Sequence, residues 1–224
     1  MANIPLTQPN AGRRARAATR AVLLDALGTL VALEDPWVRL RETFPEVPEE
    51  EMVAAVRAEM SYYRSHCAEG RDPGSLAELR ERCAALISER IGREVGVEVL
   101  LGAIRFSAYP DAPPAIGALR RRGIACVCVS NWDISLHRVL ERCGLAALLD
   151  GAVCSAEAGV SKPDPAIFEA ALGIAGCSPR EALVVGDTPD TDIAGAAAAG
   201  IPALLIDRDG GGDISSLREV AGLV

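Results

Sequence analysis

The stretch that decides the fold reads Ala21-Val-Leu-Leu-Asp25-Ala-Leu-Gly-Thr29-Leu30. Four apolar residues lead directly into a carboxylate, and a Gly-Thr pair follows at once. A short apolar run that ends at a turn signal is typical of a strand buried on both faces in a parallel sheet. Asp25 would then stand at the carboxyl end of that strand, the edge at which open α/β sheets bind their ligands.

The same pattern, an apolar run followed by a polar residue, recurs further along the chain. Polar residues follow three more apolar runs: Ser130 and Asn131 after residues 124–129, Asp187 after residues 182–185, and Lys162 a short loop beyond residues 151–154. Because parallel strands end at one edge of their sheet, these side chains are expected to gather along one rim with Asp25.

From Tyr109 onward, strand patterns alternate with helix patterns, which predicts a parallel sheet with helical crossovers. The fold class is therefore α/β, with a three-layer Rossmann-like core. The expected strands are 21–24, 124–129, 152–154, 182–185 and 203–206, and the expected helices are 115–122, 134–143, 165–175 and 191–199, with one short helix near the C-terminus.

Between the first strand and this region lies a block without strand periodicity. Helices are expected over residues 37–44, 48–67, 75–91 and 97–106, the third of them with Ser75 as N-cap and Glu78 as its capping-box partner. We interpret residues 34–106 as an inserted α-helical cap domain and residues 20–33 with 107–224 as the core domain. The arginine-rich residues 1–19 are expected to form a disordered lead-in.

Composition narrows the functional classes. The formal net charge is -8 and the isoelectric point about 4.9, which argues against a nucleic-acid partner and against an anionic membrane surface. No apolar stretch reaches membrane-spanning length. The seven cysteines are scattered and never spaced as Cys-x-x-Cys, which favours a reducing compartment, here the cytoplasm.

The rim residues form a chemically coherent set. Asp25, Asp187 and the nearby Asp192 would crowd carboxylates together, and hard oxygen ligands of this kind favour Mg²⁺. Ser130, Asn131 and Lys162 supply donors suited to phosphate oxygens, and Lys162 is the only lysine among 23 basic residues. A metal, a lysine and hydroxyl donors around one carboxylate are the groups that catalyse phosphoryl transfer to an aspartate nucleophile.

These motifs resemble the haloacid dehalogenase-like hydrolase superfamily, in its form with a helical cap after the first strand. The resemblance covers roughly residues 20 to 210. Its four motifs correspond to Asp25-Ala-Leu-Gly-Thr-Leu30, to Ser130-Asn131, to Lys162-Pro163 and to the run from Gly186-Asp187 through Asp192 to Gly195.

The resemblance implies a role for each position. Asp25 would be the nucleophile, with Ser130 and Lys162 as further catalytic residues. Mg²⁺ would be held by Asp25, Asp187 and the backbone carbonyl of Leu27, with Asp192 nearby. The substrate-binding candidates are Thr29, Asn131 and Trp132.

One position departs from the phosphatase pattern Asp-x-Asp, whose second Asp protonates the leaving group. This chain has Leu27 there, and leucine cannot transfer a proton, a function worth about 10²–10⁴ in rate. The first interpretation is a Mg²⁺-dependent phosphatase for a small phosphorylated metabolite that is slow on ordinary esters. A 2-haloacid dehalogenase, which needs no leaving-group acid, and a catalytically degenerate ligand- or protein-binding member remain alternatives. The family's phosphonate-cleaving members use a cap lysine to form a Schiff base. The cap of this chain contains no lysine, so this chemistry is excluded.

Overall fold

The predicted first strand, β1 (Ala21–Leu24), lies in the middle of a five-stranded parallel sheet of order β5-β4-β1-β6-β7. The computed structural model describes residues 18–224, so the expected lead-in over residues 1–19 lies outside the described residues apart from its last two positions. β1 pairs on both sides, with Leu24 opposite Cys128 on one neighbour and Val185 on the other. All four of its residues are buried, which explains why the strand is apolar throughout. The other strands are β4 (Ala125–Ser130), β5 (Gly151–Cys154), β6 (Ala182–Gly186) and β7 (Ala203–Leu205).

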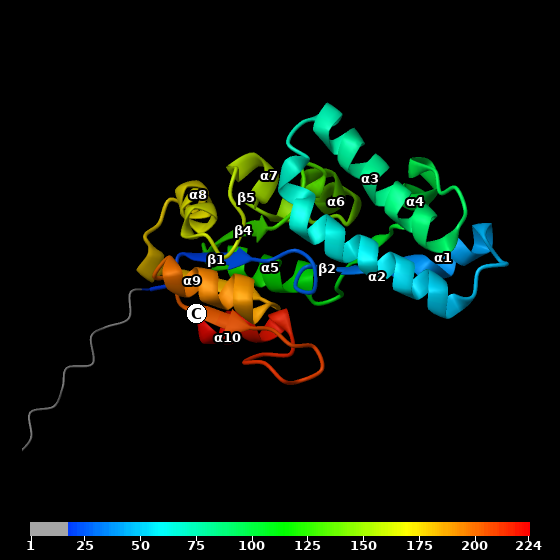
Figure 1. Ribbon diagram of the computed structural model, residues 1–224. Coiled ribbons are helices and arrows are strands. Elements are labelled where there is room, and N and C mark those ends of the chain that lie inside the picture. Colours follow the sequence, from blue (N-terminus) through cyan, green and yellow to red (C-terminus); the bar gives the residue numbers. More distant parts are fainter. Residues whose placement is uncertain (1–17) are drawn as a thin grey trace, which may run out of the picture.

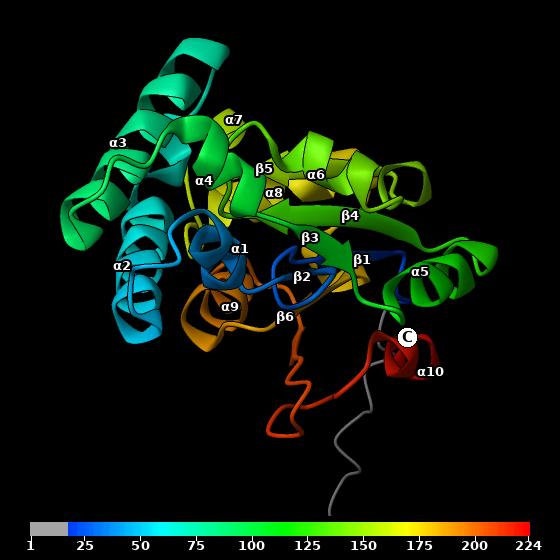
Figure 2. The ribbon, with the colours of Figure 1, turned by 90° about the vertical axis from the view of Figure 1, so that its right-hand side faces the viewer.

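Helices cover both faces of this sheet, which confirms the three-layer α/β prediction (Figure 1, Figure 2). Alternate residues of β1 serve the two faces: Val22 and Leu24 belong to one buried cluster, Ala21 and Leu23 to the other. The first cluster packs under α5 (Ala112–Arg121), α6 (Leu136–Arg142) and α10 (Val220–Leu223), and the second under α8 (Pro165–Ala175) and α9 (Ala194–Ala198).

The block between β1 and the rest of the sheet is helical and has its own core. Its helices are α1 (Pro36–Thr43), α2 (Glu49–His66), α3 (Pro73–Ile91) and α4 (Val97–Ala103), which lie together at one end of the molecule (Figure 1). Leu40, Met52, Leu79 and Ile87 are among the buried residues of this separate apolar cluster. We use the word cap for these four helices.

Two details of the cap correct the sequence-based predictions. The N-cap of α3 is Asp72, not Ser75: its carboxylate accepts hydrogen bonds from the backbone N–H groups of Gly74 and Ser75. Ser75 takes the third helical position of that capping box, which the prediction gave to Glu78. An Asp followed by Pro caps a helix as well as Ser does, and the proline fits the first helical position.

The predicted helix over residues 97–106 was wrong at its end. Helix α4 stops at Ala103, and Phe106 begins β3 (Phe106–Ala108), which pairs antiparallel with β2 (Val31–Leu33). This two-stranded ribbon carries the chain into the cap and back to the core. Its hydrogen-bond partners lie about 75 residues apart in the sequence, so neither three-residue strand shows a local pattern.

After β6 the predicted helix over residues 191–199 is divided into a π-helical turn (Pro189–Ile193) and the short α9. A four-residue helix that was not predicted, α7 (Ser155–Ala158), follows β5. No helix in the described part of the chain is long and apolar enough to cross a membrane.

Candidate active site

At the carboxyl ends of β1, β4 and β6, three predicted residues lie around the ammonium group of a fourth, Lys162. Lys162 Nζ lies 2.5 Å from Asp25 Oδ1 and 2.5 Å from Asp192 Oδ1, and it donates a third hydrogen bond to the Val129 carbonyl at 3.0 Å. Ser130 Oγ donates to the same Asp25 oxygen at 3.1 Å. All four polar side chains are buried. The ammonium therefore has every proton engaged and holds two carboxylates that come from opposite ends of the chain.

A third carboxylate, that of Asp187, completes this group. One carboxylate oxygen each from Asp25, Asp187 and Asp192 lies within 4.8 Å of the others. Three ionised carboxylates and one ammonium leave a net charge of -2. An all-oxygen donor set with this charge is chemically suited to Mg²⁺, which prefers carboxylate ligands and retains some of its waters. Asp190 is exposed and lies outside this group.

Burial and crowding shift the ionisation of these side chains. Burial raises the pKa of Asp25 to about 7; the Lys162 ammonium opposes this shift, whereas Asp192 and Asp187 add to it. Partial burial also raises the pKa of Asp187, with the charge of Asp192 contributing. Burial lowers the pKa of Lys162, but Asp25 and Asp192 outweigh it, so its pKa lies above the ordinary value and Lys162 stays protonated. The carboxylates thus carry an electrostatic cost that a bound cation would offset.

Two glycines let the backbone approach these carboxylates. Gly28 has φ +88°, and a Cβ there would lie 2.0 Å from Asp187 Oδ2. A Cβ at Gly186 would lie 2.3 Å from Asp192 Cγ. The turn after β1 therefore packs directly on the acidic residues after β6, which is only possible without side chains at these positions.

Asn131, predicted to bind the substrate, contacts the backbone of Lys162. Its side-chain oxygen accepts a hydrogen bond from the Lys162 backbone N–H at 2.7 Å, and its amide donates to the Lys162 carbonyl at 2.9 Å. Asn131 also lines the cavity described below. In this arrangement its amide fixes the segment that carries Lys162.

The remaining predicted positions differ in their access to the cavity. Leu27 and Trp132 line it, and Trp132 packs against Phe106 with ring centroids 5.1 Å apart. Thr29 is fully buried, is absent from the cavity lining, and its hydroxyl has no hydrogen-bond partner within residues 18–224.

Arg208 is a residue of the site region that the sequence analysis missed. Its guanidinium donates to the carbonyls of Gly28 and Thr29 at 3.1 and 2.6 Å, forms an ion pair with Asp111 and stacks 3.4 Å from the Tyr109 ring centroid. It therefore braces the turn after Asp25 from a loop near the C-terminus. A single arginine in a glycine-rich loop shows no local signal of this long-range contact.

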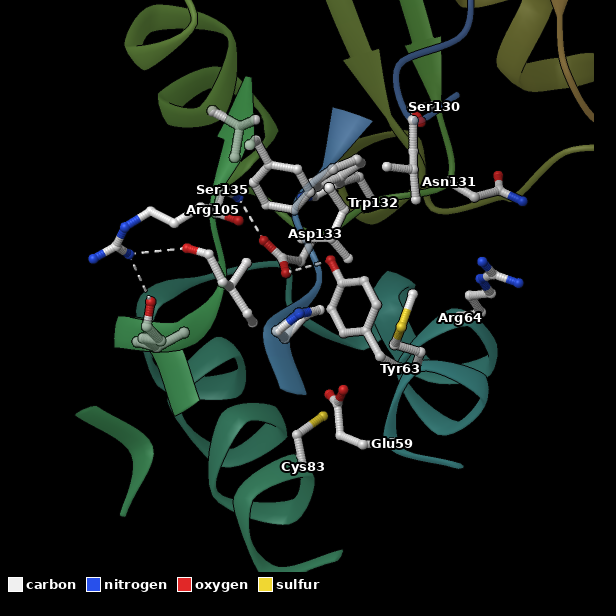
Figure 3. Close-up of a pocket in the computed structure, with 18 of the residues that line it drawn as sticks. Glu59, Tyr63, Arg64, Cys83, Arg105, Ser130, Asn131, Trp132, Asp133 and Ser135 are labelled. Atoms are coloured by element: carbon white, nitrogen blue, oxygen red, sulfur yellow. Dashed lines mark hydrogen bonds between the residues drawn. The ribbon is translucent and has the colours of Figure 1, made fainter. Parts of the chain in front are cut away.

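A cavity of about 1300 Å³ lies between the rim and the cap. Its core side includes Asp25, Lys162 and Asp187, and α2 contributes Glu59 and Tyr63 from the cap. Tyr63 Oη donates to Asp133 Oδ2 at 2.7 Å, which joins the cap to the loop after β4 (Figure 3). Burial, and secondarily Asp133, raises the pKa of Tyr63 well above its ordinary value, so the hydroxyl keeps its proton.

Solved structures resemble this fold over nearly its whole length. A phosphatase of Thermococcus onnurineus superposes with a TM-score of 0.65 at 23% identity, covering 92% of this chain and 97% of its own. The L-2-haloacid dehalogenase of Xanthobacter autotrophicus superposes with a TM-score of 0.69 at 20% identity, covering 92% and 98%. At these identities the likeness establishes the fold, and both chemistries occur on it.

Curated relatives are more similar in sequence over a shorter span. The phosphoserine phosphatase of Thermus thermophilus is 40% identical over 105 residues, or 46% of this chain and 42% of that protein. The phosphoglycolate phosphatase of Rhodospirillum rubrum is 40% identical over 101 residues, or 45% and 42%. The chain thus spans less than half the length of these relatives. A family description, haloacid dehalogenase-like hydrolase, matches residues 19–200, and the chain belongs to that family of hydrolases.

Proposed function

We propose that this protein is a Mg²⁺-dependent phosphatase that acts on a small phosphorylated metabolite, with Asp25 as the nucleophile. The observation that carries the proposal is the arrangement of Lys162 between Asp25 and Asp192, with Asp187 beside them. The names of the curated relatives, phosphoserine phosphatase and phosphoglycolate phosphatase, support the same reaction class.

Each residue of the rim has a task in this reaction. An Asp25 carboxylate oxygen bonds to phosphorus while the bond to the leaving-group oxygen breaks, and the leaving group takes the electron pair. Water then hydrolyses the aspartyl phosphate. Lys162 orients Asp25 and favours its ionised form, and Ser130 donates to the same carboxylate. Mg²⁺ held by Asp25, Asp187 and Asp192, with the Leu27 carbonyl as a further ligand, would supply positive charge to the phosphoryl oxygens.

Leu27 restricts the leaving group. Its side chain lines the cavity where the family's phosphatase pattern has an acid, and it offers no proton. Leaving groups that depart as stable anions, such as the carboxylate of an acyl phosphate, need little protonation. We therefore propose that such substrates, or esters that bring their own proton donor, are turned over faster than simple alkyl phosphates.

One observation favours a second candidate, a 2-haloacid dehalogenase. Halide leaves without a proton, so Leu27 is no handicap in that reaction. The crowded carboxylates at Asp187 and Asp192 count against it, because they gain most from a bound cation.

We also propose that the protein works in the cytoplasm, in keeping with its seven unpaired cysteines.

The deciding experiment compares phosphate release from acetyl phosphate and p-nitrophenyl phosphate, with Mg²⁺ and with EDTA, beside chloride release from 2-chloropropionate. We expect Mg²⁺-dependent phosphate release that is faster from acetyl phosphate. Chloride release that EDTA does not affect would establish the dehalogenase instead. If neither phosphate nor chloride is released, both hydrolytic proposals are overturned and a binding protein remains.

A further inference from the structure

Glu59 interrupts the apolar face of α2. The buried positions of this helix are Met52, Ala55, Val56 and Glu59, which follow the three- and four-residue spacing of a face that packs on a core. The first three contribute to the apolar cluster of the cap. The fourth position carries a carboxyl group where this pattern calls for a hydrophobic side chain.

This carboxyl group has no cationic partner. Glu59 is only 6% exposed, and within residues 18–224 no lysine, arginine or histidine forms an ion pair with it. The thiol of Cys83 on α3, a weak hydrogen-bond donor, interacts with it. Burial raises the pKa of Glu59, because a charge is unfavourable away from water. A buried carboxylate without a partner is costly and gains strongly from a cation.

Glu59 faces the same cavity as the catalytic rim. Its carboxyl group points away from its helix into the space between α2 and α3, with the Cys83 sulfur beside it (Figure 3). Val56, Met60 and Leu79 line this cap end of the cavity and supply no charge. Five arginines also line the cavity: Arg80 on α3 is half-buried, and Arg64, Arg105, Arg138 and Arg142 are exposed. None of the five forms an ion pair with Glu59 in the described residues.

Once Mg²⁺ offsets the negative charge of the rim, the two ends of the cavity differ in the charge they favour. Lys162 and Ser130 lie at the end that takes a phosphoryl group, and Glu59 offers an isolated acceptor at the other end. Building on the proposed function, we propose that Glu59 binds an ammonium group on the leaving group, so that the preferred substrates are phosphate monoesters of amino alcohols. An ammonium places a compensating charge beside the carboxylate, which a hydroxyl or a methyl group does not.

Binding and turnover are tested separately with matched compounds. Non-hydrolysable ω-aminoalkyl phosphonates of two to six carbons are titrated calorimetrically against alkyl and ω-hydroxyalkyl phosphonates of equal length. Phosphate release is then measured with Mg²⁺ from the three corresponding series of phosphate esters. We expect the amino series to bind about 10- to 100-fold more tightly at the best chain length, as for a charge-assisted hydrogen bond.

Variants then assign this preference to one carboxyl group. Glu59→Gln keeps the size and removes the charge, and should abolish the preference for the amino series. Glu89→Gln removes an exposed carboxylate of the neighbouring helix α3 that makes no ion pair in the described residues, and should keep it. If Glu59→Gln fails to fold, equal binding of the three series by the unmodified protein still overturns the proposal, and Glu59→Asp, which keeps the charge, should retain the amino preference.

Several results would overturn the inference. Equal binding of the three series, a preference for hydroxyl compounds, or an amino preference that survives Glu59→Gln would each show that Glu59 does not select ammonium. A clear amino preference in binding without any phosphate release, from these esters or from acetyl phosphate, would support Glu59 as the ammonium site and refute the phosphatase proposal.

Discussion

The core rim and the cap wall of the cavity treat buried charge in opposite ways. At the rim, Asp25 and Asp192 share one ammonium, and Ser130 and the Thr188 backbone N–H supply further hydrogen bonds to them. In the cap wall, Glu59 interacts with the Cys83 thiol and forms no ion pair in the described residues. A satisfied network is rigid and suits a reaction centre whose geometry must hold. An unsatisfied group gains most from whatever enters the cavity, which suits the selection of a substrate.

The largest expected effect on activity is that of replacing the proposed nucleophile, Asp25. Asp25→Asn should lower phosphate release by at least about 10³-fold, because an amide oxygen at this position is a poor nucleophile. The measurement is phosphate release from acetyl phosphate, with circular dichroism as a check on folding. Asp190→Asn, an exposed acid outside the carboxylate group, is the matched control and should retain activity. Full activity of Asp25→Asn would refute the mechanism.

Restoring an acid at position 27 should have the next largest effect. Leu27→Asp should raise turnover of a simple alkyl phosphate by roughly 10²–10⁴, the usual contribution of general acid–base catalysis. Acetyl phosphate, with its better leaving group, should gain less. Leu27→Asn is the control, because asparagine has the shape of aspartate but is not a general acid. Its turnover should not rise. An equal gain in both variants would mean that the bulk of Leu27, rather than its chemistry, limits the rate.

The pH dependence of stability should distinguish the two regions. In EDTA, the free energy of unfolding should fall as pH rises from about 4 to about 7, since Asp25 has its pKa raised from 3.8 to about 7 in the folded protein. The folded state then binds more protons than the unfolded state over this range. The raised pKa of Glu59 contributes a change of the same sign.

Mg²⁺ should separate these two contributions. At pH 8, Mg²⁺ bound at the rim should raise the free energy of unfolding by about a few kcal/mol, in proportion to the occupancy of the metal site, and so restore the stability that ionised Asp25 costs. The contribution of Glu59 should not change. Urea unfolding of the unmodified protein, Asp25→Asn and Glu59→Gln, with Mg²⁺ and with EDTA, measures both. A pH slope that neither substitution reduces would show that other groups dominate.

The smallest effect concerns the contact that joins the two regions. Tyr63→Phe removes the hydrogen bond to Asp133 and should lower the free energy of unfolding by about 1–2 kcal/mol. It should also raise KM several-fold with little change in kcat, because the cap would spend less time closed. Tyr62→Phe is the control, since the Tyr62 hydroxyl makes no hydrogen bond within the described residues. An unchanged KM would mean that this contact does not govern closure.

The strands and their polar ends could be predicted because the signal is local. A run such as 21–24 is apolar at every position only if both faces are buried, and parallel pairing then places the residues that follow at one edge. Helix α8 was predicted with its observed limits, since a proline starts it and Gly176 follows its end. On this basis Asp25, Ser130, Lys162 and Asp187 were placed on one rim from the sequence.

The contacts that only the tertiary structure decided are those between distant segments. The β2–β3 ribbon, the Arg208 brace on the turn after Asp25, and the Tyr63 contact with Asp133 each join residues at least 70 positions apart. Glu59 had a local signal, a carboxyl group in an apolar stripe, but its lack of a cation depends on every element packed around it. Sequence periodicity reports which face of an element is buried; what that face meets is decided by the packing of the whole chain.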